Sequence, residues 1–137
     1  MNGMKAWTRM ALGGLALAVS ASGGAAGPDQ AFDDVLAARY RAVEAAIEAR
    51  AGAAWFEALY DDSIVLAGEG SPATVRGRQA LMPVIDEIVR TTRSCTLVPD
   101  AARGRSAGLG YSFVTYRFSP ADASASDYQV RALFVWK

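Results

Sequence analysis

WFEALYDDSIVLAGEGSPATVRGRQALMPVIDEIV, residues 55–89, is the stretch that decides the fold of this chain. An aromatic helix end at 55–60 leads into a β-branched and apolar run at 63–67, which reads as a strand. The Gly- and Pro-containing break at 68–72 then turns the chain back into a second short strand at 73–76. The stretch therefore predicts a β-hairpin between two helices.

Helices are predicted on both sides of this hairpin. Residues 28–50 carry apolar side chains at steps of three and four, and a shorter helix follows at 53–59. Gly77 starts a third helix, in which Pro83 either causes a kink or moves the regular part to begin near Met82. The apolar stripe of the first helix is Phe32, Val35, Leu36, Tyr40, Val43 and Ile47. The apolar face of the third is Leu81, Ile85, Ile88 and Val89.

After the third helix the apolar pattern changes to alternation, which is typical of strands. Three antiparallel strands are predicted at 94–98, 108–118 and 127–136, joined by polar connections at 100–105 and 119–126. Three helices, one hairpin and consecutive strands indicate an α+β domain with its helices against one face of an antiparallel sheet.

The N-terminal residues 1–26 have the three parts of a secretory signal. Lys5 and Arg9 give a basic start, 10–21 is an apolar run too short to span a bilayer comfortably, and small residues precede a cleavage site near Gly27. We expect a periplasmic or secreted protein without stable membrane association after cleavage. An uncleaved N-terminal anchor is the alternative reading.

The remaining residues, 27–137, fit one small domain with a single core. Loss of Lys5 and Arg9 leaves 12 of the 14 basic residues against 14 acidic ones, a net charge of about −2. This balance gives no electrostatic reason to expect nucleic acid as a partner.

Several kinds of chemistry are excluded by missing residue types. The chain has no His, so a Ser-His-Asp mechanism and a His-ligated zinc site are ruled out, and we expect neither a metal nor a cofactor. Lys137 is the only Lys beyond the signal, and the single Cys95 is read as a small buried side chain. Proton transfer would fall to Asp, Glu or Tyr.

The phrases LYDDSIVL (59–66), VRGRQAL (75–81) and LGYSFVTYRF (109–118), with the final FVWK, resemble the nuclear transport factor 2-like superfamily. The resemblance is greater to its SnoaL-like and ketosteroid isomerase-like bacterial domains of unknown function. It implies a sheet wrapped around the helices as a cone, an apolar pocket at the open end, and a homodimer formed through the outer sheet.

The predicted pocket takes its lining from the aromatic residues of the first two helices and of the strands. Because side chains alternate along a strand, either strand face could line the cone. Arg131 could hold a carboxylate or enolate there, and a solvent-facing or acid-paired arginine is the alternative. The predicted lining is Tyr40, Trp55, Tyr60, Tyr111, Phe113, Tyr116, Arg131, Phe134 and Trp136.

Asp61 and Asp62 are the candidate catalytic residues, as paired carboxylates beside an aromatic cluster. One of them could have a raised pKa and act as acid or base, whereas the competing interpretation is a pair that caps a turn. The general-base Asp of ketosteroid isomerases would fall near Ala67 here, which cannot transfer a proton. Their oxyanion-donor Tyr has a loose counterpart in Tyr40.

The family also implies one more strand after FVWK. We expect the chain to be truncated, to borrow a strand from a partner, or to be unstable. Three functions stay open: an exported domain that binds a small apolar or aromatic ligand, an isomerase, cyclase or lyase using Asp/Tyr acid–base chemistry, and a pocketless oligomerisation or interaction domain.

Overall fold

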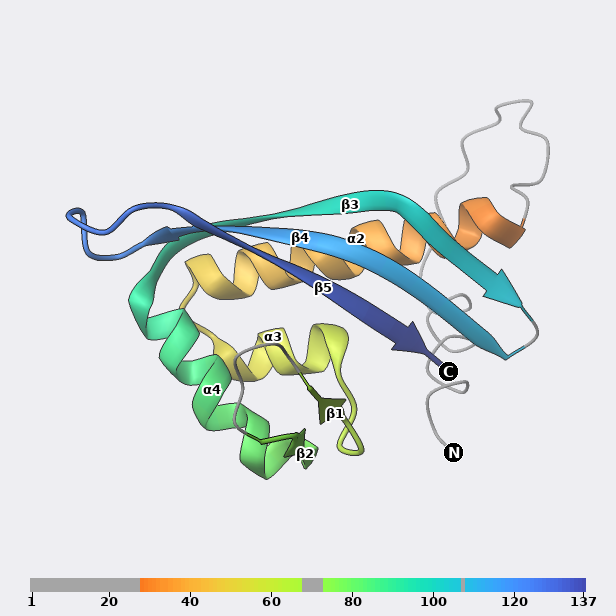
Figure 1. Ribbon diagram of the computed structural model, residues 1–137, viewed down its shortest axis with the longest axis horizontal. Coiled ribbons are helices and arrows are strands. Elements are labelled where there is room, and N and C mark those ends of the chain that lie inside the picture. The colour runs from red at the N-terminus through yellow and green to blue at the C-terminus, as the bar shows by residue number, and fades with distance from the viewer. Residues whose placement is uncertain (1–27, 68–72, 107) are drawn as a thin grey trace, which may run out of the picture.

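The computed structural model describes residues 28–67, 73–106 and 108–137 and has the predicted α+β architecture (Figure 1). The predicted signal at 1–26 and the turn at 68–72 lie outside the described residues. In chain order the elements are α2 (Pro28–Glu48), α3 (Gly52–Leu59), β1 (Val65–Leu66), β2 (Val75–Arg76), α4 (Gly77–Thr91), β3 (Thr92–Ser106), β4 (Leu109–Pro120) and β5 (Tyr128–Trp136).

The main sheet is an antiparallel meander in the order β3-β4-β5. It curves over α2, which runs along its inner side, while α3 and α4 lie below α2 (Figure 1). The middle strand fixes the register, with Val114 opposite Pro99 on β3 and opposite Ala132 on β5. Consecutive strands with short connections are the simplest way to pair neighbouring segments.

The predicted hairpin is present as a separate two-stranded sheet of β1 and β2. Val65 pairs with Arg76 and Leu66 with Val75. At its end the Gly77 N–H donates to the Ile64 carbonyl over 2.8 Å, and Gly77 has a φ of 77°, which glycine adopts without a steric penalty. Because β1 and β2 do not pair with β5, the described sheet is not closed into a full cone.

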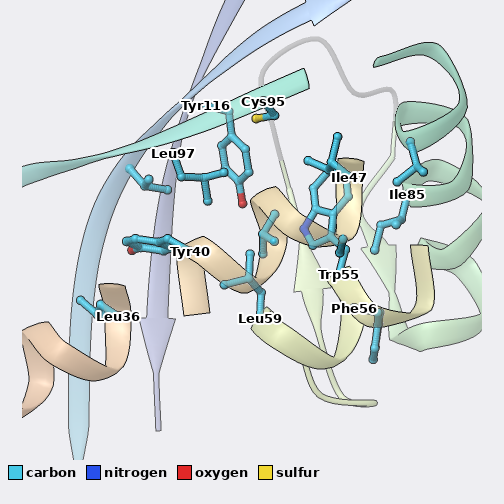
Figure 2. Packing of buried hydrophobic residues seen from close by; sticks show 14 of the residues in the cluster. Leu36, Tyr40, Ile47, Trp55, Phe56, Leu59, Ile85, Cys95, Leu97 and Tyr116 are labelled. Atoms are coloured by element: carbon cyan, nitrogen blue, oxygen red, sulfur yellow. The ribbon is translucent and has the colours of Figure 1, made fainter. Parts of the chain in front are cut away.

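One hydrophobic core joins the three helices to the inner face of β3 and β4 (Figure 2). The predicted stripe of α2 is buried at Phe32, Leu36, Tyr40, Val43 and Ile47, with Val35 partly buried. None of the described helices is long and apolar enough to cross a membrane.

One predicted boundary is wrong. Residues 100–105 are not a connection, because β3 continues to Ser106 through a register shift between Pro99 and Arg103. A bulge is where a strand tolerates proline, which has no N–H to donate. The predicted start of α4 at Gly77 is confirmed, and because the helix continues past Pro83, its regular part does not begin only at Met82.

Candidate functional site

The two faces of the sheet separate the predicted pocket residues into two groups. On β4 the side chains of Ser112, Val114, Tyr116 and Phe118 are buried against the helices. Their register partners on β5, which include Ala132 and Phe134, share this inner face. Six predicted residues lie on the inner side of the sheet or on the helices that it covers: Tyr40, Trp55, Tyr60, Tyr116, Phe134 and Trp136.

The other three predicted residues, Tyr111, Phe113 and Arg131, lie on the outer face. This corrects the prediction of one pocket lined by all nine, because a sheet lies between the two groups. The Arg131 guanidinium forms a 2.6 Å ion pair with Asp100 and lies 4.6 Å from the centre of the Phe113 ring. Arg131 is therefore the acid-paired surface arginine of the alternative interpretation.

On the inner face, a buried serine holds two of the predicted aromatic residues. The Ser112 hydroxyl is 2.9 Å from the Tyr40 hydroxyl and accepts a 3.0 Å hydrogen bond from the indole N–H of Trp136. Burial raises the pKa of Tyr40, and the hydrogen bond to Ser112 acts in the opposite direction. The Tyr40 hydroxyl is thus hydrogen-bonded inside the core. An oxyanion donor would instead have its hydroxyl facing a substrate.

A second group of polar atoms lies further along the same interior. The Tyr116 and Trp55 rings have centroids 6.2 Å apart, and the two side chains are 4% and 3% exposed. Figure 2 shows the Tyr116 hydroxyl and the Trp55 indole nitrogen pointing into the same space between the sheet, α2 and α3. Within the described residues, neither of these two buried atoms forms a hydrogen bond of good geometry, and the nearby polar group is the Tyr60 hydroxyl.

The Tyr60 side chain completes this group, which we call the inner polar site (Trp55, Tyr60 and Tyr116). Burial raises the pKa of Tyr60 to about 12, and hydrogen-bonding interactions of its hydroxyl with Tyr116 and Trp55 oppose the rise. Burial also raises the pKa of Tyr116 well above its usual range. Both phenols are therefore neutral at ordinary pH and can donate or accept a hydrogen bond.

The candidate catalytic carboxylates lie away from this interior, in the turn after α3. Asp61 accepts hydrogen bonds from the Ser63 N–H at 2.8 Å and the Ser63 hydroxyl at 2.6 Å. These bonds lower the pKa of Asp61, so the expected raised pKa is wrong for this residue. Asp62 is exposed and 3.8 Å from Arg78. Asp61 therefore caps the turn, and Asp62 lies on the surface beside it.

Two residues of the interior were not predicted to contribute to it. No motif marks either of them: Ser112 is one polar residue in an alternating strand, and Arg39 is a charged residue outside the apolar stripe of α2. In the structure Arg39 donates a 2.7 Å hydrogen bond to the Ala58 carbonyl, and its guanidinium lies 5.7 Å from the centre of the Trp136 ring. Burial lowers the pKa of Arg39.

A groove of about 430 Å³ lies elsewhere, between the start of α2 and the end of β3. Its walls carry charges of both signs, and Arg103 forms a two-point ion pair with Asp33 across it. Across the part of the chain that the structure describes, no three His, Cys, Asp or Glu side chains gather as a metal site would require.

The fold and the site define the class of protein: an α+β domain whose aromatic interior contains buried polar atoms. No protein-family model matches the chain, and no curated protein matches it. Solved structures do match. A protein from Xanthomonas campestris, proposed to be a calcium/calmodulin dependent protein kinase II association domain, is 18% identical with a TM-score of 0.57, over 86% of this chain and 85% of that one.

Two further structures support the same fold. An NTF2-like (nuclear transport factor 2-like) protein of unknown function from Exiguobacterium sp. 255-15 has a TM-score of 0.53 and 12% identity, over 74% of this chain and 83% of that one. A Mycobacterium tuberculosis protein in complex with estradiol-17beta-hemisuccinate has a TM-score of 0.50 and 14% identity, over 74% and 81% of the two chains. This chain therefore has the NTF2-like fold that its sequence motifs predicted.

Proposed function

We propose that this protein binds a small aromatic or apolar ligand with a single polar oxygen, held at the inner polar site. The observation that carries the proposal is the pair of buried polar atoms, Tyr116 Oη and Trp55 Nε1, which have only the Tyr60 hydroxyl beside them and form no hydrogen bond of good geometry. A buried polar group without a partner costs about 1–3 kcal/mol. A ligand oxygen placed between the two atoms would remove that cost.

The polar atoms define which ligand group fits. The Trp55 indole N–H only donates, so it needs an acceptor, whereas a tyrosine hydroxyl does either. A carbonyl, ether or phenol oxygen meets both requirements. No carboxylate belongs to the inner polar site, since Asp61 is turned to the surface and bonded to Ser63. The site thus suits a neutral oxygen better than an amine or a metal.

The surrounding side chains determine the shape of the ligand. Aromatic rings continue from the polar atoms toward β5, with the Tyr60 and Phe134 rings 6.1 Å apart and the Phe134 and Trp136 rings stacked at 5.4 Å. Tyr60 and Phe134 are only partly buried, so each has one side toward solvent. A flat ring would enter past these two side chains. The bound estradiol hemisuccinate of the Mycobacterium tuberculosis protein shows that this fold accommodates a ligand with rings.

A matched ligand pair tests the proposal. Binding of 2-naphthol and of naphthalene, which lacks the oxygen, is measured by quenching of tryptophan fluorescence. We expect naphthol to bind more tightly than naphthalene. Tyr116→Phe should reduce the ratio of the two affinities by a factor of about 2 to 13, because one hydrogen bond is worth about 0.5–1.5 kcal/mol net. Tyr111→Phe, on the outer face, is the control and should change nothing. Equal binding of both compounds, or no binding of either, would refute the proposal.

We also propose that the protein is exported and acts in the periplasm or outside the cell. The support is the basic, apolar and small-residue order of its first 26 residues. Mass spectrometry of the protein recovered from the periplasm and medium should give an N-terminus near Gly27. Recovery of only the full-length chain from the cytoplasm would contradict export.

Homodimerisation is a further proposal, supported by apolar side chains exposed on the main sheet. Leu109, Tyr111, Leu133 and Val135 are between 45% and 58% exposed, all on its outer side or at its end. Exposed apolar side chains that cluster in this way indicate an interaction surface. Light scattering of the purified protein gives the number of chains.

A further inference from the structure

The Tyr60 side chain lies where a ligand of the inner polar site would bind. Its ring packs against two other aromatic rings, with centroids 5.7 Å from Phe56 and 6.1 Å from Phe134. Both distances are those of favourable aromatic pairs. Its hydroxyl is the polar group beside the Tyr116 hydroxyl and the Trp55 indole N–H. The fold therefore already places one phenol ring, with its oxygen at the two buried polar atoms, in an aromatic slot.

The polar contacts of this phenol are favourable but poorly aligned. Interactions with Tyr116 and Trp55 oppose the rise in the pKa of Tyr60, as donors to its oxygen do. Yet Tyr116 Oη and Trp55 Nε1 form no hydrogen bond of good geometry. The Tyr60 ring is tied to the backbone at the end of α3, which restricts how its oxygen meets the two donors. An untethered phenol has no such restriction, so it would gain more from the same two atoms.

The position of Tyr60 in the chain permits its side chain to move. Tyr60 is the first residue after α3, with an extended backbone at φ −118° and ψ 161°, and its N–H donates to the Phe56 carbonyl over 2.8 Å. The turn at 61–63 that follows is exposed. Rotation about the side-chain bonds of Tyr60 leaves this backbone hydrogen bond and α3 unchanged. The ring can therefore leave the slot without unfolding a helix or a strand.

We infer that the ligand is a phenol and that Tyr60 occupies its place beforehand: an incoming phenol displaces the Tyr60 side chain and brings its own oxygen to Trp55 and Tyr116. The inference rests on the proposed function, because it concerns the same site. It adds the chemical class of the ligand and the residue that competes with it.

Displacement predicts that Tyr60 weakens binding. Only molecules with the Tyr60 ring turned out are competent, and the apparent affinity is reduced by their fraction. Tyr60→Phe keeps the ring and removes the hydroxyl that holds it, so this fraction rises. We expect both 2-naphthol and naphthalene to bind more tightly to Tyr60→Phe, by about 2-fold or more, the lower end of the worth of one hydrogen bond. Their ratio should stay unchanged, because Trp55 and Tyr116 still meet the ligand oxygen.

Tyr40→Phe is the matched control. It also removes a buried tyrosine hydroxyl with a hydrogen-bond partner, Ser112 at 2.9 Å, but one outside the inner polar site. The affinities of this variant for both compounds should equal those of the wild type. If Tyr60 were instead a direct contact of the bound ligand, Tyr60→Phe would weaken naphthol binding and leave naphthalene unchanged. The two interpretations thus predict effects of opposite sign on naphthol.

Fluorine NMR follows the displacement itself. The chain has five tyrosines, so labelling with 3-fluorotyrosine gives five signals, and the signal absent from Tyr60→Phe belongs to Tyr60. Saturating naphthol should move this signal toward that of Tyr111, which is 45% exposed. A Tyr60 signal that stays in place while naphthol binds would overturn the displacement.

The two proposals fail separately. Equal affinities of the wild type for naphthol and naphthalene would refute the proposed function and, with it, the phenol. If the wild type prefers naphthol but Tyr60→Phe binds it equally well or more weakly, the displacement is overturned and the proposed function stands. No binding of either compound to the wild type and to Tyr60→Phe would overturn both.

Discussion

Replacing Ser112 with alanine removes the hydroxyl that joins β4 to α2 and to the end of β5. That hydroxyl is 2% exposed and takes part in two hydrogen bonds, with Tyr40 at 2.9 Å and with Trp136 at 3.0 Å. Each such bond contributes about 0.5–1.5 kcal/mol net, so Ser112→Ala should lower the free energy of unfolding by about 1–3 kcal/mol. Against a total of about 5–15 kcal/mol, this loss is easily measured.

Urea denaturation followed by circular dichroism gives the free energy of unfolding, and a double-mutant cycle assigns its parts. Tyr40→Phe removes one of the two bonds, and its coupling to Ser112→Ala should be about 0.5–1.5 kcal/mol. Ser106→Ala, at the exposed end of β3, serves as the control with no expected change. A loss below about 0.5 kcal/mol for Ser112→Ala, or additive effects in the double variant, would refute the role given to this hydroxyl.

Three further predictions concern stability and binding. The pKa of Tyr60 is about 12 in the folded protein and 10.0 in an unfolded chain. The unfolded chain therefore loses the Tyr60 proton at a lower pH than the folded protein does. As a result, the free energy of unfolding should fall by about 2–3 kcal/mol from pH 10 to 12. Tyr60→Phe should make this decline in urea midpoints shallower, and the remaining decline comes from Tyr40 and Tyr116, whose pKa values burial also raises. Gly77→Ala forces a side chain into φ 77° and should cost about 1–3 kcal/mol in the same assay, whereas an unchanged midpoint would show that the turn relaxes. Asp61→Asn should leave naphthol binding unchanged, and a several-fold loss would reinstate Asp61 at the site.

The sequence was sufficient for the arrangement of helices and hairpin because periodicity reports burial directly. The stripe of α2 is buried as its spacing predicts, and Gly77 marks the turn that follows the hairpin. Alternation also divides β4 into two faces. It could not say which face meets the helices, because both carry aromatic residues, with Tyr111 and Phe113 on one and Tyr116 on the other. Ser112 made the inner face look more polar than it is.

The errors at the site trace back largely to the length of β3. Polar residues at 100–105 read as a connection, since their pattern has no apolar alternation, yet the strand continues through them by shifting register after Pro99. That continuation carries Asp100 to within 2.6 Å of Arg131 and holds Arg131 on the outer face. A strand that ended at 98, as predicted, would have left Arg131 without this acid and made a pocket role plausible. Because the sequence does not reveal this bulge, residues 100–105 were assigned to a connection. For the same reason Arg131, the only cation in the predicted pocket, was assigned to the pocket lining.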